Sequence, residues 1–213
     1  ATMSTWVTPT NAELFSRMEG WSWQTEVFQP VNWLVLYPFR FLPALWIPTA
    51  LNVFNAALAA LVITLVARII ALLPHNRTAD QREMEQDENS LFSGSTAWIP
   101  PVLGALVLGL QISFWECATA VSTRGEVVDA FISAYVIRCL LEFRIDQPQS
   151  WMSRAAFVYA AGMTNNWGLV GLAPVFLAAV IWIKGLGFFN ARFLGRMALW
   201  GGVGLLFYTA LTL

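Results

Sequence analysis

The segment over residues 115–129 combines three acidic side chains, Glu116, Glu126 and Asp129, with one arginine, Arg124. A guanidinium offers a planar fork of hydrogen-bond donors, so Arg124 can hold a phosphate group. The neighbouring acids can instead pair with Arg124 in a structural ion pair, and water at the helix ends can keep them solvated. The pattern therefore predicts a phosphate-binding segment, with a purely structural role left open.

Residues 1–30 form a second polar segment, which contains Asn11, Glu13, Glu19 and Glu26 together with several tryptophans. A carboxylate at a membrane surface can accept the proton of an acceptor hydroxyl. It can equally serve only to keep the chain solvated. Each of these acids is a candidate general base by residue type alone.

A third polar segment, residues 164–167, interrupts a long apolar region. The amides of Asn165 and Asn166 can hydrogen-bond to sugar hydroxyls or to a lipid phosphate. Helix capping explains the two asparagines equally well. A binding role requires that the fold bring them to the same face as the other two polar segments.

The composition is that of a membrane protein. Of the 213 residues, 57% are hydrophobic and 12% are charged, and the mean hydropathy is +0.59. A soluble domain carries about 25% charged residues, so lipid must cover part of this surface. The net charge of −1 and the lack of a basic block argue against a nucleic-acid partner. The single histidine excludes a histidine-rich metal site, and Cys117 and Cys139 suit packing better than a zinc site or a disulfide.

Five apolar regions reach or approach the length needed to cross a bilayer, which takes about 20 residues as helix because each backbone amide must be satisfied internally. One of these regions is divided by the polar segment at residues 164–167 and is expected to form a hairpin of two short helices. We therefore predict an all-α fold, a single polytopic transmembrane helix bundle over residues 1–213. Its expected membrane helices are residues 49–73, 98–115, 126–143, 153–183 (the broken hairpin) and 192–213.

The connections complete the predicted topology. Residues 1–48 are expected to form an outer-face loop whose last part, residues 31–47, is a juxtamembrane helix interrupted by Pro38 and Pro43. Its aromatic side chains suit the depth of the membrane interface. Residues 74–97 form the long polar loop, and their charges of both signs predict a solvated cytoplasmic segment.

Arginine and lysine are unevenly distributed over this topology. With residues 1–48 outside, nine of the twelve basic residues fall at or near the inner face, which obeys the positive-inside rule. The three polar segments then converge on the outer face. The nine are Arg68, Arg77, Arg82, Arg138, Arg144, Arg154, Lys184, Arg192 and Arg196, and the other three are Arg17, Arg40 and Arg124. Because the first residue is Ala1 and not Met, and Leu213 lies within an apolar run, we also expect this chain to be a fragment, with at least one helix before Ala1 and further chain after Leu213.

Four short stretches resemble, in order, the landmarks of a bacterial family of multi-pass membrane proteins of unknown function. That family is similar to the GT-C glycosyltransferases, which include the protein O-mannosyltransferases. The stretches are PTNAEL at residues 9–14, WIPTALN at 46–52, FWECATA at 114–120 with Gly125 and Glu126 following, and GMTNNW at 162–167. Each is loose alone, and together they cover nearly the whole chain.

The resemblance implies a transferase at the outer face of a bacterial inner (cytoplasmic) membrane, with a sugar carried on a polyprenyl phosphate as donor. It makes Glu13 the candidate base and Arg124 the candidate phosphate contact, and it places five further residues around the substrate: Asn11, Glu116, Glu126, Asn165 and Asn166. A GT-C site can bind a divalent metal, and no ligand set in this sequence requires one.

Two departures from the family pattern bear on activity. The family's first loop has an Asp-Ser-Gly-Glu pattern, and the matching residues here are Thr10-Asn11-Ala12-Glu13, so the glutamate is kept and the aspartate is not. An amide cannot accept a proton as a carboxylate does. Either Glu13 serves as the base, or this member has lost transferase activity. A His-Pro-Pro-Gly motif of the family would fall near residues 26–32, where only Pro30 remains.

Two alternatives from other classes stay open. A non-catalytic membrane subunit would pack against other membrane proteins through the glycines of the last apolar region, which permit close approach of helices. Those glycines include Gly195, Gly201, Gly202 and Gly204. A transporter is less favoured, because no internal repeat is present and few ionisable residues other than Arg68 and Arg138 fall in mid-membrane.

Overall fold

In the computed structural model, the described residues are 12–18, 29–73, 98–122, 124–146 and 148–211, and every regular element among them is a helix. The predicted all-α class is confirmed. The elements are α1 (Ala12–Met18), α2 (Pro30–Leu36), η1 (Tyr37–Phe41), η2 (Ala44–Trp46), α3 (Ile47–Leu72), α5 (Ile99–Leu110), α6 (Ile112–Thr119), α7 (Glu126–Asp146), α8 (Gln149–Asn165), α9 (Gly168–Gly171), α10 (Ala173–Lys184), η4 (Gly185–Phe189), α11 (Ala191–Leu205) and η5 (Leu206–Leu211).

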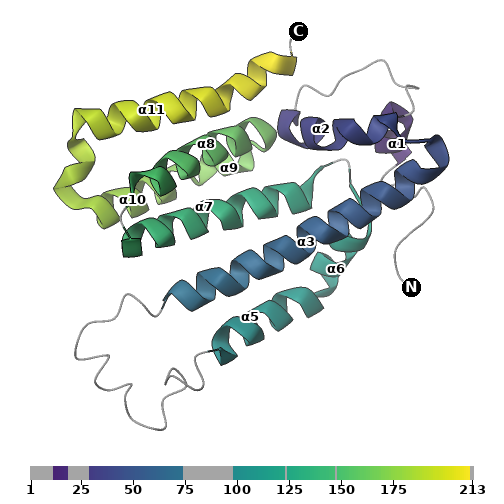
Figure 1. Ribbon diagram of the computed structural model, residues 1–213, viewed down its shortest axis with the longest axis horizontal. Helices are drawn as coiled ribbons and strands as arrows, with labels where there is room; N and C mark the ends of the chain where they lie inside the picture. Colours follow the sequence, from purple (N-terminus) through teal and green to yellow (C-terminus); the bar gives the residue numbers. More distant parts are fainter. Residues whose placement is uncertain (1–11, 19–28, 74–97, 123, 147, 212–213) are drawn as a thin grey trace.

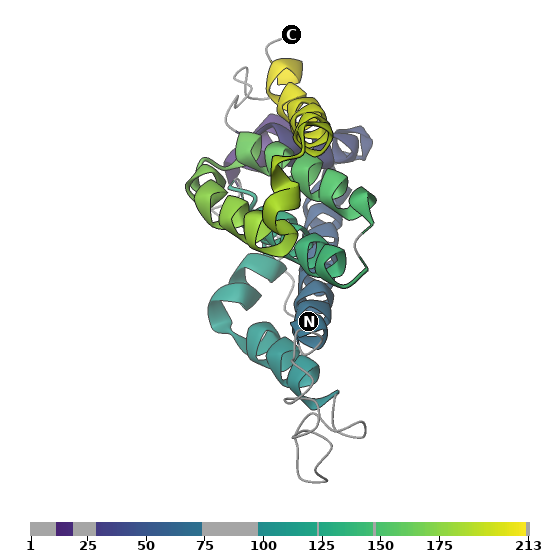
Figure 2. The same cartoon turned by 90° about the vertical axis from the view of Figure 1, so that its left-hand side faces the viewer.

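The long helices lie side by side in the order α5, α3, α7, α8 and α11 (Figure 1). Turning the molecule by 90° keeps α5 and α11 at opposite edges (Figure 2). Helix α10 packs against this row, where its residues Phe176 and Val180 join a cluster built on Leu140 and Phe143 of α7 and Phe193 of α11. Short α1 and α2 lie at one end of the row, beside the start of α3.

Helix α3 is long and apolar enough to cross a bilayer. Its 26 residues rise by about 39 Å. Helices α5 and α6 meet the same requirement only when taken together, and they meet at a bend of 69°. Helix α7 carries six charged side chains in 21 residues, and α8, α10 and α11 are shorter. By length and composition, the described residues contain one helix that can span a membrane, or two if α5 and α6 together count as a span. The multi-pass arrangement therefore stays a prediction.

The structure breaks one predicted membrane helix and divides the predicted juxtamembrane helix near its prolines. The region over residues 98–115 breaks at Gln111, whose backbone is extended (φ −68°, ψ 124°). The predicted juxtamembrane helix is a series of short pieces, α2, η1 and η2, divided near Pro38 and Pro43. A proline lacks the amide hydrogen that continues a helix and restricts the residue before it. These short pieces expose Phe41 and Leu45, which are 77% and 91% accessible.

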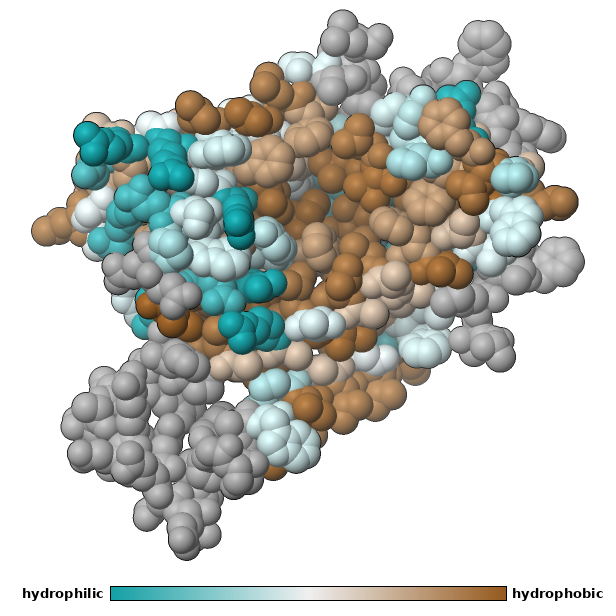
Figure 3. Space-filling model, in the orientation of Figure 1, coloured by the Kyte–Doolittle hydropathy of each residue, from teal (hydrophilic) through white to brown (hydrophobic). Residues whose placement is uncertain are grey.

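Hydrophilic side chains gather at one end of the row, where α7 ends and α8 begins, and apolar side chains cover the middle (Figure 3). We call this the basic end. Buried Glu142 accepts hydrogen bonds from Nε and Nη2 of Arg68 at 3.2 and 3.1 Å and lies 3.6 Å from Nε of Arg138. Trp151 lies beneath the guanidiniums of both Arg138 and Arg154, at 5.7 and 5.0 Å. Among the described residues, this end also holds Arg144, Lys184, Arg192 and Arg196.

Candidate functional site

The opposite end of the row, which we call the polar end, is built around Asp129 in the first turns of α7. Its two carboxylate oxygens accept hydrogen bonds from Nδ2 of Asn165 at 2.6 Å and Nδ2 of Asn166 at 2.7 Å. These asparagines end α8 and follow it, so one carboxylate fastens the start of α7 to the end of α8. Within the described part of the chain no cation pairs with Asp129, and two side-chain amides donate hydrogen bonds to its carboxylate.

Asn165 also holds α2 in place. Its Oδ1 accepts a hydrogen bond from the backbone amide of Asn32 at 2.9 Å, and both residues are buried, with 2% and 4% of their surface accessible. Gly125 has a φ of +61°, and a Cβ on it would lie 2.7 Å from Cγ of Asn32. Only glycine adopts that backbone conformation at low cost and leaves that room. Asn32, Gly125 and Asn165 therefore fix three elements against one another.

Two further asparagines on α3 fix the connection between α6 and α7. Asn52 accepts a hydrogen bond from the backbone amide of Val121 at 2.9 Å. Asn55, one turn later, donates from Nδ2 to the carbonyl of Cys117 at 2.6 Å and to that of Ala118 at 3.3 Å. A buried backbone group without a partner would cost about as much as a lost hydrogen bond, so these amides stabilise a connection that leaves regular helix. We call this pair the asparagine clamp.

The acids around that connection face solvent. Glu126 is exposed, and its Oε2 accepts from Sγ of Cys117 at 3.4 Å and from Oγ of Ser122 at 3.3 Å. Arg124 and Glu116 are exposed as well. They take no part in the hydrogen bonds that join Asp129 to the asparagines. The polar end thus has an inner layer of amides and Asp129 and an outer layer of exposed charged groups.

The predicted base lies on α1. Glu13 is exposed, while Leu14 and Phe15 beside it are buried in a cluster with residues of α2, α3 and the α6–α7 connection, among them Leu51 and Val121. Helix α1 is therefore packed on the same end of the molecule as the asparagines. Asn11, the other residue predicted in this loop, lies outside the described residues.

The structure brings Asn165 and Asn166 together with Asp129, an acid that the sequence analysis notes without assigning it a contact. It separates their roles, because Asn165 is buried between helices and Asn166 is exposed. Sequence reasoning missed Asn32, Asn52 and Asn55. The signal was present for the last two, since amides three residues apart in an otherwise apolar helix share one face.

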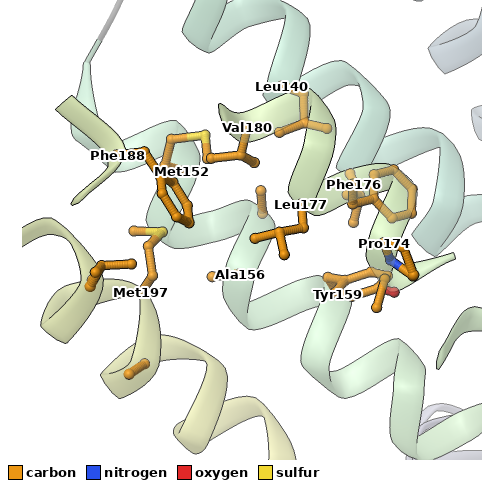
Figure 4. A pocket seen from close by; sticks show the side chains of 15 residues that line it. Leu140, Met152, Ala156, Tyr159, Pro174, Phe176, Leu177, Val180, Phe188 and Met197 are labelled. Carbon is orange, nitrogen blue, oxygen red and sulfur yellow. The ribbon is translucent and has the colours of Figure 1, made fainter. Parts of the chain in front are cut away.

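A metal ion has no ready ligand set in the described residues, where no group of three or more His, Cys, Asp or Glu side chains comes together. An apolar cavity of about 640 Å³ lies between α7, α8, α10 and α11. Its lining includes Met152, Tyr159, Leu177, Phe188 and Met197, whose side chains point toward it (Figure 4). It extends from Tyr159, which donates a hydrogen bond to the carbonyl of Leu169 near the polar end, to Phe188 at the basic end.

No protein-family model, curated protein or solved structure matches this chain.

Proposed function

We propose that the protein is a GT-C-like membrane glycosyltransferase that moves a sugar from a polyprenyl-phosphate carrier to an acceptor at the outer face of a bacterial inner membrane. The observation that carries this proposal is the convergence at the polar end of α1, α2, the α6–α7 connection and the end of α8. Apart from α2, these segments contain or adjoin the residues that the family resemblance assigns to the active site.

The distribution of charge supports a multi-pass arrangement. Seven described cations lie at the basic end, while the elements of the polar end carry three, Arg17, Arg40 and Arg124. Such an asymmetry orients membrane proteins with the basic end in the cytoplasm. Large exposed apolar side chains on α3, α5, α10 and α11, such as Leu61, Val107, Trp182 and Leu199, suit contact with lipid.

In the proposed reaction, Glu13 accepts the proton of the acceptor hydroxyl as that oxygen bonds to the anomeric carbon of the sugar. The bond between that carbon and the phosphate oxygen breaks, and polyprenyl phosphate leaves. Arg124 would hold the phosphate, because a guanidinium binds it through two parallel hydrogen bonds. Exposed Asn166, Glu116 and Glu126 would contact the sugar.

Buried Asn165 acts differently in this proposal. Its side chain is already committed to Asp129 and to the backbone of Asn32, so it positions the site instead of binding substrate. The apolar cavity supports a lipid-linked donor, because an isoprenoid chain matches a lining made of Leu, Met, Phe and Ala side chains.

The test is binding of polyprenyl phosphate to the full-length protein in nanodiscs. Arg124→Ala is expected to weaken binding by about tenfold, since a charge-assisted hydrogen bond is worth about 1.5–3 kcal/mol. Arg40→Ala, which removes another exposed arginine of the same end, is the matched control and should bind as the wild type does. Glu13→Gln should abolish sugar transfer while leaving binding intact. Unchanged transfer in both Glu13→Gln and Arg124→Ala would refute the proposal.

One observation favours the alternative of a non-catalytic subunit that packs in a larger assembly. A Cβ on Gly195, Gly201 or Gly202 of α11 would meet nothing within 4 Å, whereas one on Gly204 would lie 2.5 Å from the carbonyl oxygen of Phe157. Gly204 is thus used for packing inside the chain, and the other three leave a face of α11 open for another helix. Loss of an assembly on Gly202→Leu, with transfer absent from the wild type, would favour this alternative.

A further inference from the structure

A second cavity, of about 210 Å³, lies between the first half of α8 and the middle of α11, toward the basic end. Two cationic, two hydroxyl and two aromatic side chains line it, and none of these six described residues is acidic. They are Ser150, Ser153, Arg154 and Phe157 of α8 with Arg196 and Trp200 of α11. We call it the arginine cavity.

Both guanidiniums are held in place by neutral partners. Arg154 lies over the ring of Trp151 at 5.0 Å, and Nη1 of Arg196 donates to Oε1 of Gln149 at 3.1 Å. Neither forms an ion pair with a described carboxylate. Arg68 and Arg138 differ, because they share Glu142. The arginine cavity therefore holds two like charges that an anion would stabilise, and the planar fork of a guanidinium matches the oxygens of a phosphate.

The aromatic wall lies deeper than the arginines. Phe157 follows Arg154 by three residues, and Trp200 follows Arg196 by four, so each ring lies one turn along the same face of its helix, about 5 Å toward the middle of the row. The two rings meet edge to face, with centroids 6.5 Å apart. The cavity thus presents charge at the end of the molecule and apolar rings toward its middle.

We propose that the arginine cavity binds the phosphate headgroup of an anionic phospholipid in the leaflet at the basic end. Such a lipid has a charged headgroup at the membrane surface and apolar acyl chains toward the bilayer interior. The cavity likewise has its arginines at the end of the molecule and its aromatic rings toward the middle. A free phosphate would use the arginines and leave the rings without a partner. This inference rests on the membrane placement of the proposed function and not on the transferase chemistry.

The test is the thermal unfolding midpoint of the full chain in detergent, titrated separately with phosphatidylglycerol, phosphatidylcholine and inorganic phosphate. Phosphatidylglycerol is expected to raise the midpoint to a plateau, since a ligand that binds only the folded state stabilises it. The Arg154→Gln/Arg196→Gln double variant should raise the lipid concentration needed by about tenfold or more. Both side chains are exposed, so the variant should fold.

The matched control is Arg144→Gln/Arg192→Gln, which removes the same charge from the same end but outside the cavity and should bind as the wild type does. Trp200→Ala should weaken the lipid effect with both arginines intact. Equal stabilisation by phosphatidylcholine or by inorganic phosphate would overturn the proposal, as would a double variant that binds like the wild type. Arg124-dependent binding of polyprenyl phosphate would survive that failure, which separates the two proposals.

Discussion

The two ends of the molecule hold their helices together by different means. At the polar end, four asparagines join elements through hydrogen bonds of their side-chain amides. Asn52, Asn55 and Asn165 bond to backbone groups, and Asn165 and Asn166 both donate to Asp129. At the basic end, guanidiniums contact one buried carboxylate and the rings of Trp151 and Trp182. Amide contacts fix the path of the chain and depend little on salt, while contacts between charges are screened by it. The difference shows one end built for fixed geometry and the other for carrying charge.

Asn165→Ala tests the polar end and has the largest expected effect. It removes the acceptor of a buried backbone amide and one of the two donors to Asp129, so we expect a loss of about 3 kcal/mol in the free energy of unfolding. Denaturant unfolding in mild detergent measures it. The loss should be the same at low and high salt. A loss below about 1 kcal/mol would mean that water replaces the amide and that the polar end is not rigid.

Glu142→Gln tests the basic end. The substitution leaves Arg68 and Arg138 close together without the carboxylate, and we expect a loss of about 2 kcal/mol, reduced from the value for a fully buried pair because Arg68 is half exposed. Unlike the loss at Asn165, this one should shrink as salt is added. Equal salt dependence for the two variants would remove the distinction between the ends.

Trp151→Leu measures how much a ring that contacts two arginines stabilises the basic end. The ring lies under Arg138 and Arg154, and each exposed contact of this kind is worth about 0.5–1 kcal/mol, so about 1 kcal/mol should be lost. Trp182→Leu, which removes the ring beneath Arg144 alone, is the comparison and should cost less. Thermal unfolding of both variants in one detergent decides the order, and a larger loss for Trp182→Leu would contradict it.

Asn166→Ala should have the smallest effect. Its Nδ2 donates to Asp129 as Asn165 does, but the residue is exposed and water can replace the bond, so we expect a loss of about 0.5 kcal/mol. A clear loss of sugar transfer without a loss of stability would place Asn166 among the substrate contacts. A loss of both together would instead give it the structural role of Asn165.

The local sequence pattern was enough to predict the all-helical class and the break near Asn166, because apolar runs bounded by polar residues determine both. It was not enough for the bend at Gln111, where neither a proline nor a glycine stands at the break. That bend accompanies the docking of the end of α6 on Asn55, a contact between residues 62 positions apart. The partners of Asn32 and Asn52 are likewise distant in sequence, at Asn165 and Val121.

Only part of the candidate site could be predicted, because its contacts also join residues that are distant in sequence. Residue type identified Glu126, Asn165 and Asn166 as polar groups among apolar neighbours, and topology placed them on one face. The division between buried Asn165 and exposed Asn166 depends on how α2 packs, which no local pattern contains. The positions of Glu13 and Arg124 as catalytic and phosphate-binding residues stay predictions.

The asparagine clamp bears on how this protein can change over evolutionary time. Asn52 and Asn55 hold backbone atoms of residues 117, 118 and 121, and the side chains at those positions take no part in the hydrogen bonds. Ala118 and Val121 are buried, so a larger or polar side chain there would disturb the core, whereas Cys117 is only partly buried. The end of α6 can therefore acquire different chemistry at residue 117 by a single substitution while two asparagines on another helix hold its backbone in place.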